Sequence, residues 1–110
     1  MGELNIYELL VQMSGEQCYT LSHDNPATMW VVEDGIEVVY PSGNSVFLPK
    51  LMVVKGINMK INRGTLTVDD VHHEITDEHR NKTGKLMAVL RKLPGVSFDR
   101  IPRILYYKIP

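Results

Sequence analysis

The sequence predicts an α+β fold in which an N-terminal helix and a small antiparallel sheet pack with a C-terminal helix pair and a β-hairpin. Three observations predict this fold. Residues 4–13 carry apolar side chains at helical spacing, residues 18–48 are rich in strand formers separated by turn residues, and residues 67–93 contain two helix signals. The chain therefore begins with one helix, continues as a sheet and returns to helices.

Length and composition indicate one domain. The chain has 110 residues, of which 44% are hydrophobic and 23% are charged, close to the average of globular proteins. Residues 1–49 contain no Lys or Arg and have a formal net charge of −7, whereas residues 80–110 have +7. We expect a single domain with an acidic, strand-rich part over 1–61 and a basic part over 62–110.

The N-terminal part is expected to be one helix followed by strands. Apolar residues recur at i, i+3 and i+7 from Leu4, which predicts a helix over residues 4–13. Asp34-Gly35 predicts a tight hairpin turn with positive φ angles between two strands. The expected strands cover residues 18–21, 29–32, 36–40 and 45–48.

The middle of the chain is the hardest to assign. Residues 48–54 form a short apolar run that periodicity does not assign to helix or strand. Pro49 suits the first turn of a helix, so a helix is favoured there. Residues 59–61 are then expected to form a short strand.

Two helices are predicted in the basic part. Thr67 and Asp70 have the spacing of a capping box, which starts the first helix. Asn81 is expected to cap a second helix that ends at Leu93, before a Pro-Gly pair. One side of this second helix is apolar, with Leu86, Val89, Leu90 and Leu93, and the opposite side is basic and small, with Gly84, Lys85, Ala88, Arg91 and Lys92.

Strand-like residues beyond the second helix predict a hairpin whose turn, residues 99–103, carries Arg100 and Arg103. The order of strand, capped helix, break, basic helix and hairpin over residues 62–109 resembles the winged helix-turn-helix family. The string Leu66-Thr67-Val68-Asp69-Asp70-Val71 belongs to this resemblance. In that family the second helix enters the major groove, and the wing contacts the backbone or the minor groove.

The resemblance implies that the protein binds duplex DNA, as a regulator or accessory factor. It assigns Lys85, Arg91 and Lys92 to the groove and Arg100 and Arg103 to the wing. The candidate nucleic-acid-binding residues are therefore Lys82, Lys85, Arg91, Lys92, Arg100 and Arg103.

Other functions stay open. The acidic half suits a protein-interaction or inhibitor module of the mobile-element or phage type, with Glu33, Asp34 and Glu37 as contact residues. The opposite charges of the two ends are also compatible with neutralisation within the fold or in a head-to-tail homodimer.

No cofactor, metal site or enzymatic activity is expected. Residues 69–79 concentrate five carboxylates and three histidines, but Asp77 stands where a zinc-protease helix has its second histidine. A solvated acidic helix is the better interpretation, and a hydrolase would require bound metal. Cys18 with His23 as nucleophile and base is less favoured than Cys18 as a core residue.

The sequence also predicts a cytoplasmic location. Cys18 is the single cysteine, so it cannot form an internal disulfide. No apolar run approaches the roughly 20 residues that span a bilayer, and no basic signal-peptide region precedes Ile6. Ile6 also occupies the position where a myristoylation signal has Ser or Thr.

Overall fold

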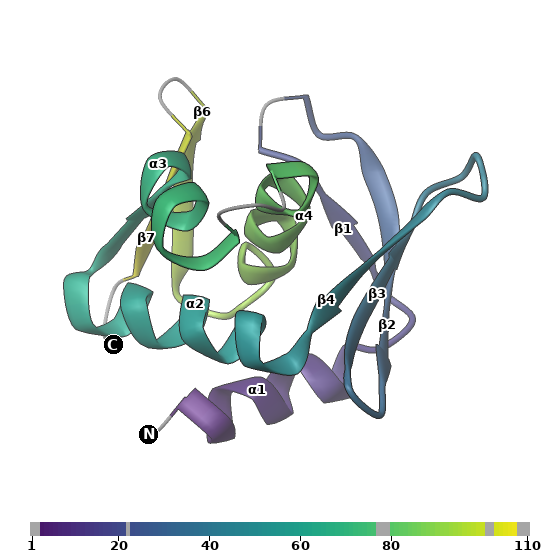
Figure 1. The fold of residues 1–110 in the computed structure, drawn as a ribbon, viewed down its shortest axis with the longest axis horizontal. Coiled ribbons are helices and arrows are strands. Elements are labelled where there is room, and N and C mark those ends of the chain that lie inside the picture. Colours follow the sequence, from purple (N-terminus) through teal and green to yellow (C-terminus); the bar gives the residue numbers. More distant parts are fainter. Residues whose placement is uncertain (1–2, 22, 77–79, 101–102, 108–110) are drawn as a thin grey trace.

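The computed structural model describes residues 3–21, 23–76, 80–100 and 103–107 and shows two antiparallel sheets with helices between and beside them (Figure 1). Its first sheet has four strands and its second has three. This arrangement confirms the predicted α+β class. Within the described residues, no helix is both long and apolar enough to cross a bilayer.

The N-terminal part begins with helix α1 (Glu3–Gln12). Ile6, Tyr7 and Leu10 share one side of this helix and are buried, which docks α1 against the core. The four strands that follow form an antiparallel meander in the order β1-β2-β3-β4. They are β1 (Gln17–Tyr19), β2 (Pro26–Val32), β3 (Gly35–Val39) and β4 (Ser45–Pro49), so the predicted strands are confirmed with small shifts at their ends.

The hairpin between β2 and β3 forms for a different reason from the predicted one. Val32 pairs directly with Gly35, so the loop consists of Glu33 and Asp34. The prediction of positive φ angles at Asp34-Gly35 is wrong, because the described residues with positive φ do not include either of them. Gly35 is required by a close approach: a Cβ atom there would lie 2.2 Å from the carbonyl oxygen of Leu48.

Helix α2 (Lys50–Arg63) confirms the helix favoured at Pro49 and corrects the strand predicted over residues 59–61. Those residues continue the helix because Val53, Ile57 and Lys60 are buried at helical spacing. Gly64 ends α2 in the left-handed conformation, and its N–H donates to the carbonyl of Lys60. The helix therefore crosses the boundary expected between the acidic and basic parts.

The C-terminal part contains a second sheet in the order β5-β7-β6. Its elements are β5 (Thr65–Thr67), α3 (Val68–Val71), the π-helical turn η1 (His72–Thr76), α4 (Arg80–Leu90), β6 (Val96–Arg100) and β7 (Arg103–Tyr107). Helix α4 ends three residues earlier than predicted, although Leu93 is still buried. The side chain of Asn81, the predicted cap, lies outside the described residues.

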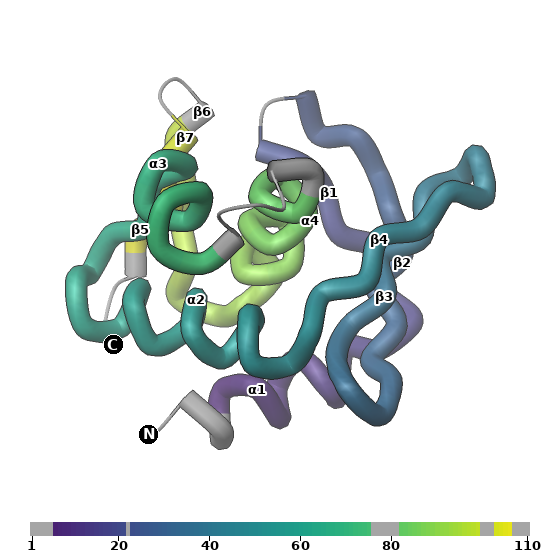
Figure 2. Tube along the Cα trace, in the orientation of Figure 1, coloured from purple at the N-terminus to yellow at the C-terminus, as the bar shows by residue number. Residues whose placement is uncertain are grey.

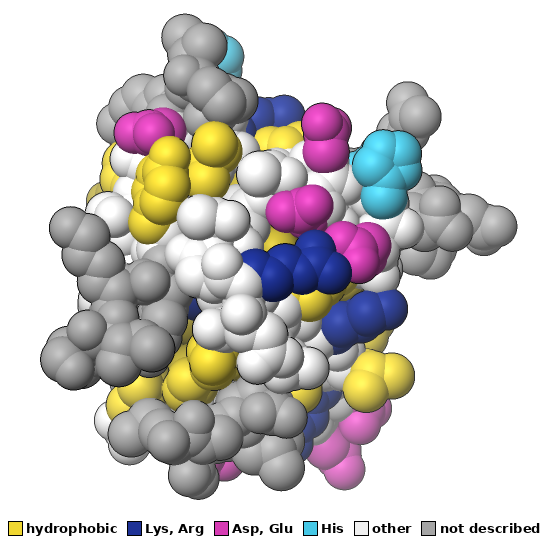
Figure 3. Space-filling view, turned by 90° about the vertical axis from the view of Figure 1, so that its left-hand side faces the viewer, with side chains coloured by type: hydrophobic (Ala, Val, Ile, Leu, Met, Phe, Trp, Pro, Cys, Tyr) yellow, Lys and Arg dark blue, Asp and Glu magenta, His cyan; other side chains and the backbone are white. Residues whose placement is uncertain are grey.

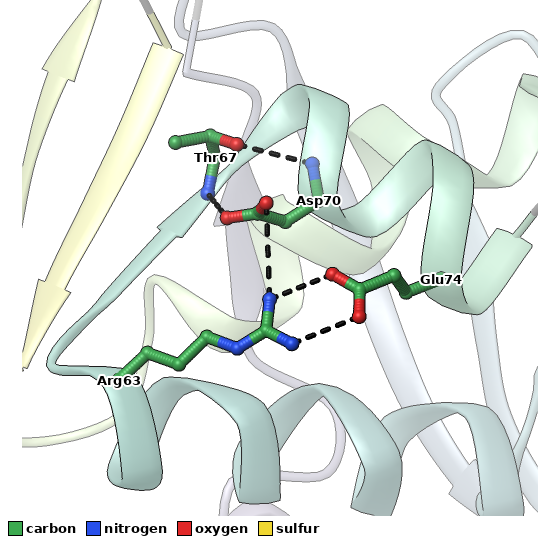
Figure 4. A network of polar contacts seen from close by, with 4 residues as sticks. All are labelled: Arg63, Thr67, Asp70 and Glu74. Carbon is green, nitrogen blue, oxygen red and sulfur yellow. Dashed lines mark hydrogen bonds and ion pairs between the residues drawn. The ribbon is translucent and has the colours of Figure 1, made fainter.

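The predicted capping box forms at the start of α3. Thr67 Oγ1 accepts from the N–H of Asp70, and the Asp70 carboxylate accepts from the N–H of Thr67 (Figure 4). Arg63, at the end of α2, donates to both carboxylate oxygens of Glu74 at 2.6 and 2.8 Å. Asp70 and Glu74 stay partly exposed to solvent, at 32% and 43%, and through this network they also hold α3 and η1 beside α2.

Helix α4 lies between the two sheets (Figure 2). Leu86, Met87, Val89 and Leu90 are all at most 1% exposed, and one hydrophobic cluster extends from α1 and the first sheet to β5 and β7. Helix α2 also packs against both sheets. The acidic and basic parts therefore share a core.

Candidate nucleic-acid interface

The hairpin β6–β7 places one predicted arginine beside α4. Arg100 pairs with Arg103 in the strand register, so both residues are strand ends rather than members of the predicted five-residue turn. The Arg103 Nη1 atom lies 3.9 Å from the position that a Cβ atom would take at Gly84. The side chain of Arg100 lies outside the described residues.

Arg103 and the first half of α4 form an open pocket with the start of α3, which we call the basic pocket. It has a volume of about 410 Å³. The side chains of Lys85, Arg103 and His72 bring two cations and an imidazole to its wall, and Asp69 is a carboxylate of the lining. The full lining is Val68, Asp69, His72, Thr83, Gly84, Lys85 and Arg103.

The elements around the basic pocket position its side chains. Gly84 leaves space for Arg103 above α4, whereas a longer side chain would meet the guanidinium. Lys85 Nζ lies 5.7 Å from the centroid of the Tyr40 ring at the end of β3, which holds its stem against the first sheet. Lys82, one turn earlier on α4, is half-buried. The arrangement can accept an anionic oxygen between cations from two elements.

Arg91 contacts the N-terminal part instead of facing outward. Its Nη1 atom donates to Asp24 Oδ1 at 2.7 Å and to the backbone carbonyls of Tyr19 and Thr20 at 3.3 and 3.2 Å. The guanidinium carbon also lies 3.9 Å from the centroid of the Phe98 ring. Arg91 thus joins the end of α4 to the loop after β1 and to β6.

Lys92 has the same orientation. Its Nζ atom donates to the carbonyl of Gln17 at 2.7 Å and to Glu16 Oε1 at 3.2 Å. The structure therefore pairs two of the predicted nucleic-acid contacts with acidic residues of the first half. This neutralisation within the fold is one of the alternatives that the charge distribution left open.

The basic and small side predicted for α4 is not an open face. Ala88 is 2% exposed, and Gly84 and Lys85 are half-buried, because the first sheet covers the side of α4 opposite to β5 and β7. Helical periodicity predicted one apolar side and therefore one free side, but α4 packs against β1 and β4 as well as against α2, α3 and η1. Only the beginning of α4 reaches the basic pocket.

The opposite charges also meet on the face formed by α2 and α3. Figure 3 shows Lys or Arg side chains beside Asp or Glu side chains on this face rather than a uniform basic surface. Arg63 with Glu74 and Asp70 is one such group. The face therefore has no single sign that would favour a long polyanion.

Two residue sets were weighed for catalysis, Cys18 with His23 and the acidic, histidine-rich segment 69–79. Cys18 is fully buried, and burial raises the pKa of its thiol, which disfavours the nucleophilic thiolate. No group of three His, Cys, Asp or Glu residues suited to a metal occurs among the described residues. The residues Asp77, Glu78 and His79 of the acidic segment lie outside them.

Arg91→Met is expected to lower the free energy of unfolding by about 2 kcal/mol, since a charge-assisted hydrogen bond and two further hydrogen bonds are lost. The Arg91 side chain is only 21% exposed, whereas the Arg63 side chain is 43% exposed, and their carboxylate partners Asp24 and Glu74 are similar at 45% and 43%. Urea denaturation should therefore show a smaller loss for Arg63→Met. An equal or larger loss for Arg63→Met would contradict the anchoring role of Arg91.

The sequence did not identify several residues of the basic pocket. Asp69 and His72 were considered as parts of an acidic, histidine-rich segment and not as neighbours of Lys85. Their proximity to Lys85 depends on the packing of α3 and β3 around α4, which local spacing does not encode. One sequence signal did indicate that Arg103 lies near α4. Arg103 belongs to the predicted hairpin, and a wing folds back toward the helix that precedes it.

Comparison of the chain with protein-family models, with curated proteins and with solved structures found no significant match.

Proposed function

We propose that the protein binds duplex nucleic acid through phosphate contacts at the basic pocket and along the β6–β7 hairpin, as a small regulator or accessory factor. The observation that carries this proposal is the meeting of Lys85 from α4 with Arg103 from β7 at an open pocket. The same helix and hairpin carry two more cations, Lys82 on α4 and Arg100 at the end of β6. Clustered cations bind phosphates by releasing condensed counterions.

We further propose that this unit is a winged helix, on the basis of the order of its elements. Helix α2 supplies the first helix of a three-helix core, α3 with η1 the second and α4 the third. The β6–β7 hairpin follows α4 in the position of a wing, and its partner strand β5 precedes α3. In this proposal the wing and the first turns of α4 approach the duplex together.

Burial of α4 favours phosphate contacts over reading of base edges. A recognition helix needs a free side to enter the major groove, and residues 86–90 of α4 are all buried. Arg91 and Lys92 are bound to β1 and its flanking residues. We therefore propose binding that tolerates changes of base sequence and excludes these two residues from the interface.

The proposal predicts a definite salt dependence. Four phosphate contacts give a slope of log Kd against log salt of roughly 3.5, and Lys85→Gln with Arg103→Gln should lower this slope by about 2. At low salt the double variant should weaken binding on the order of tenfold. Fluorescence anisotropy with labelled duplexes of equal length and unrelated sequence measures all three quantities.

Lys50→Gln with Lys55→Gln is the matched control, since both lysines are exposed on α2 and the net charge changes equally. The control should bind with the wild-type slope. A Lys85→Gln/Arg103→Gln protein with unchanged affinity and slope would refute the proposed site. An equal loss in both double variants would show attraction by net charge alone and refute it as well.

A further inference from the structure

The outer side of the first sheet, which we call the outer face, is apolar at its centre. Figure 1 shows α2 and α4 on one side of the strands β1–β4 and no described helix on the other. Alternate residues of the strands point outward, and Trp30 is 49%, Val32 42% and Phe47 39% exposed. Such an apolar group on a sheet surface marks a surface for binding.

One row of the outer face combines two aromatic rings with a carboxylate. Trp30 on β2 is the direct strand partner of Glu37 on β3, and Glu37 is the direct partner of Phe47 on β4. Side chains at such positions are neighbours on the sheet surface. A cation placed over Glu37 would meet a carboxylate between two aromatic faces, which attract cations as well.

The row is held in place by the fold. The Trp30 ring packs against the backbone of Gly15, where a Cβ atom would lie 3.3 Å from Cζ3. The Phe47 ring lies over Gly35, where a Cβ atom would lie 2.9 Å from Cζ. Both rings therefore rest on glycine backbone while staying partly exposed, Trp30 at 49% and Phe47 at 39%. Such ordering lowers the entropy cost of binding.

The surroundings of the row define the chemistry of its partner. Glu33 and Asp34 form the exposed turn between β2 and β3, and residues 1–49 contain no Lys or Arg. A hollow of about 300 Å³ beside Trp30 is lined in part by Thr28, Val39 and Pro41 and has room for an apolar side chain. The negative charge disfavours nucleic acid on this face.

We propose that the outer face binds an extended segment of a partner protein in which basic residues alternate with apolar ones. A lysine or arginine of the segment pairs with Glu37 between Trp30 and Phe47, and an apolar side chain enters the hollow beside Trp30. The occupant is a different protein, because none of the described strands β1–β7 of this chain alternates Lys or Arg with apolar residues.

Trp30 is the single tryptophan of the chain, so its fluorescence reports directly on the outer face. The probe is a capped octapeptide that alternates lysine with valine, and its matched control alternates glutamate with valine. We expect the lysine peptide to shift the Trp30 emission to the blue and to protect it from acrylamide, more weakly as salt is added. The glutamate peptide should have no effect.

Variants that keep Trp30 test the row itself. Glu37→Gln should raise the Kd of the lysine peptide about tenfold, and Phe47→Thr about threefold. Glu8→Gln on α1 and Leu51→Thr on α2, where Leu51 is 80% exposed, are the matched controls and should leave the Kd unchanged. Thermal melting of each variant establishes that it is folded.

Three outcomes would overturn the proposal. The lysine peptide leaves the Trp30 emission and quenching unchanged, or Glu37→Gln binds it as tightly as the wild type does. In the third outcome, sedimentation velocity shows a homodimer that Phe47→Thr dissociates, and the outer face then binds a second copy of the chain.

Discussion

Gly35→Ala is expected to lower the free energy of unfolding by about 3 kcal/mol, because overpacking of this size forces backbone to move. The added methyl group would lie 2.2 Å from the carbonyl oxygen of Leu48 and 3.0 Å from the backbone nitrogen of Lys50. Neither atom belongs to a flexible side chain. Strand β4 or the start of α2 must therefore shift, and the pairing of β3 with β4 weakens.

Differential scanning calorimetry measures this loss as a fall of Tm by roughly 15 °C. Gly43→Ala is the control, since Gly43 has a φ of +94° but a Cβ atom there would meet nothing within 4 Å. It should cost about 1 kcal/mol through backbone conformation alone. Equal losses for the two variants would show that the contact with Leu48 does not limit position 35.

Lys60 makes stability depend on pH. Its side chain is fully buried in α2, and burial lowers its pKa from 10.5 to about 8. Between these two values the unfolded chain binds a proton that the folded chain does not, so stability rises as the pH increases from 8 to 10.5. Below pH 8 the folded chain carries the buried Lys60 ammonium. The cost of burying this charge then lowers the free energy of unfolding by its full amount, ~3 kcal/mol.

Lys60→Met should therefore raise the free energy of unfolding by at most about 3 kcal/mol at pH 7. The gain should be about 1 kcal/mol smaller at pH 9, where the wild type has recovered part of its stability. Urea denaturation of both proteins at both pH values gives this difference. Burial also raises the pKa values of Cys18, Tyr7 and Tyr40. These residues are present in both proteins, so their contributions to the pH dependence cancel in the difference.

Lys55→Met, on the same helix but at an exposed position, is the control and should give a pH-independent difference from the wild type. A Lys60→Met gain that is equal at pH 7 and pH 9 would contradict the lowered pKa of Lys60.

Local patterns predicted most secondary structure because each depends on nearby residues. The capping box at Thr67 and the alternation along β2 and β3 are examples. The strand predicted over residues 59–61 was wrong because Lys60 interrupts the apolar pattern of α2 while being buried itself. A polar residue in a core position misleads any reading based on hydrophobic periodicity.

The candidate site was predicted less completely than the fold. Charge counting identified Lys85 and Arg103, which the structure brings together at the basic pocket. It could not separate them from Arg91 and Lys92, whose partners Asp24 and Glu16 are more than 60 positions away in sequence. Which cations are engaged depends on tertiary contacts, and for Arg91 and Lys92 these follow from the packing of α4 against β1.

The position of α4 also has an evolutionary consequence. Because α4 packs against β1 and β4, separating it from the first sheet would expose apolar residues that are now buried. Recombination that moved residues 62–110 into another protein would uncover Ala88 and its neighbours and would separate Arg91 from Asp24. We therefore expect this C-terminal unit to diversify together with the sheet that precedes it, since the two parts share contacts of α4, Arg91 and Lys92.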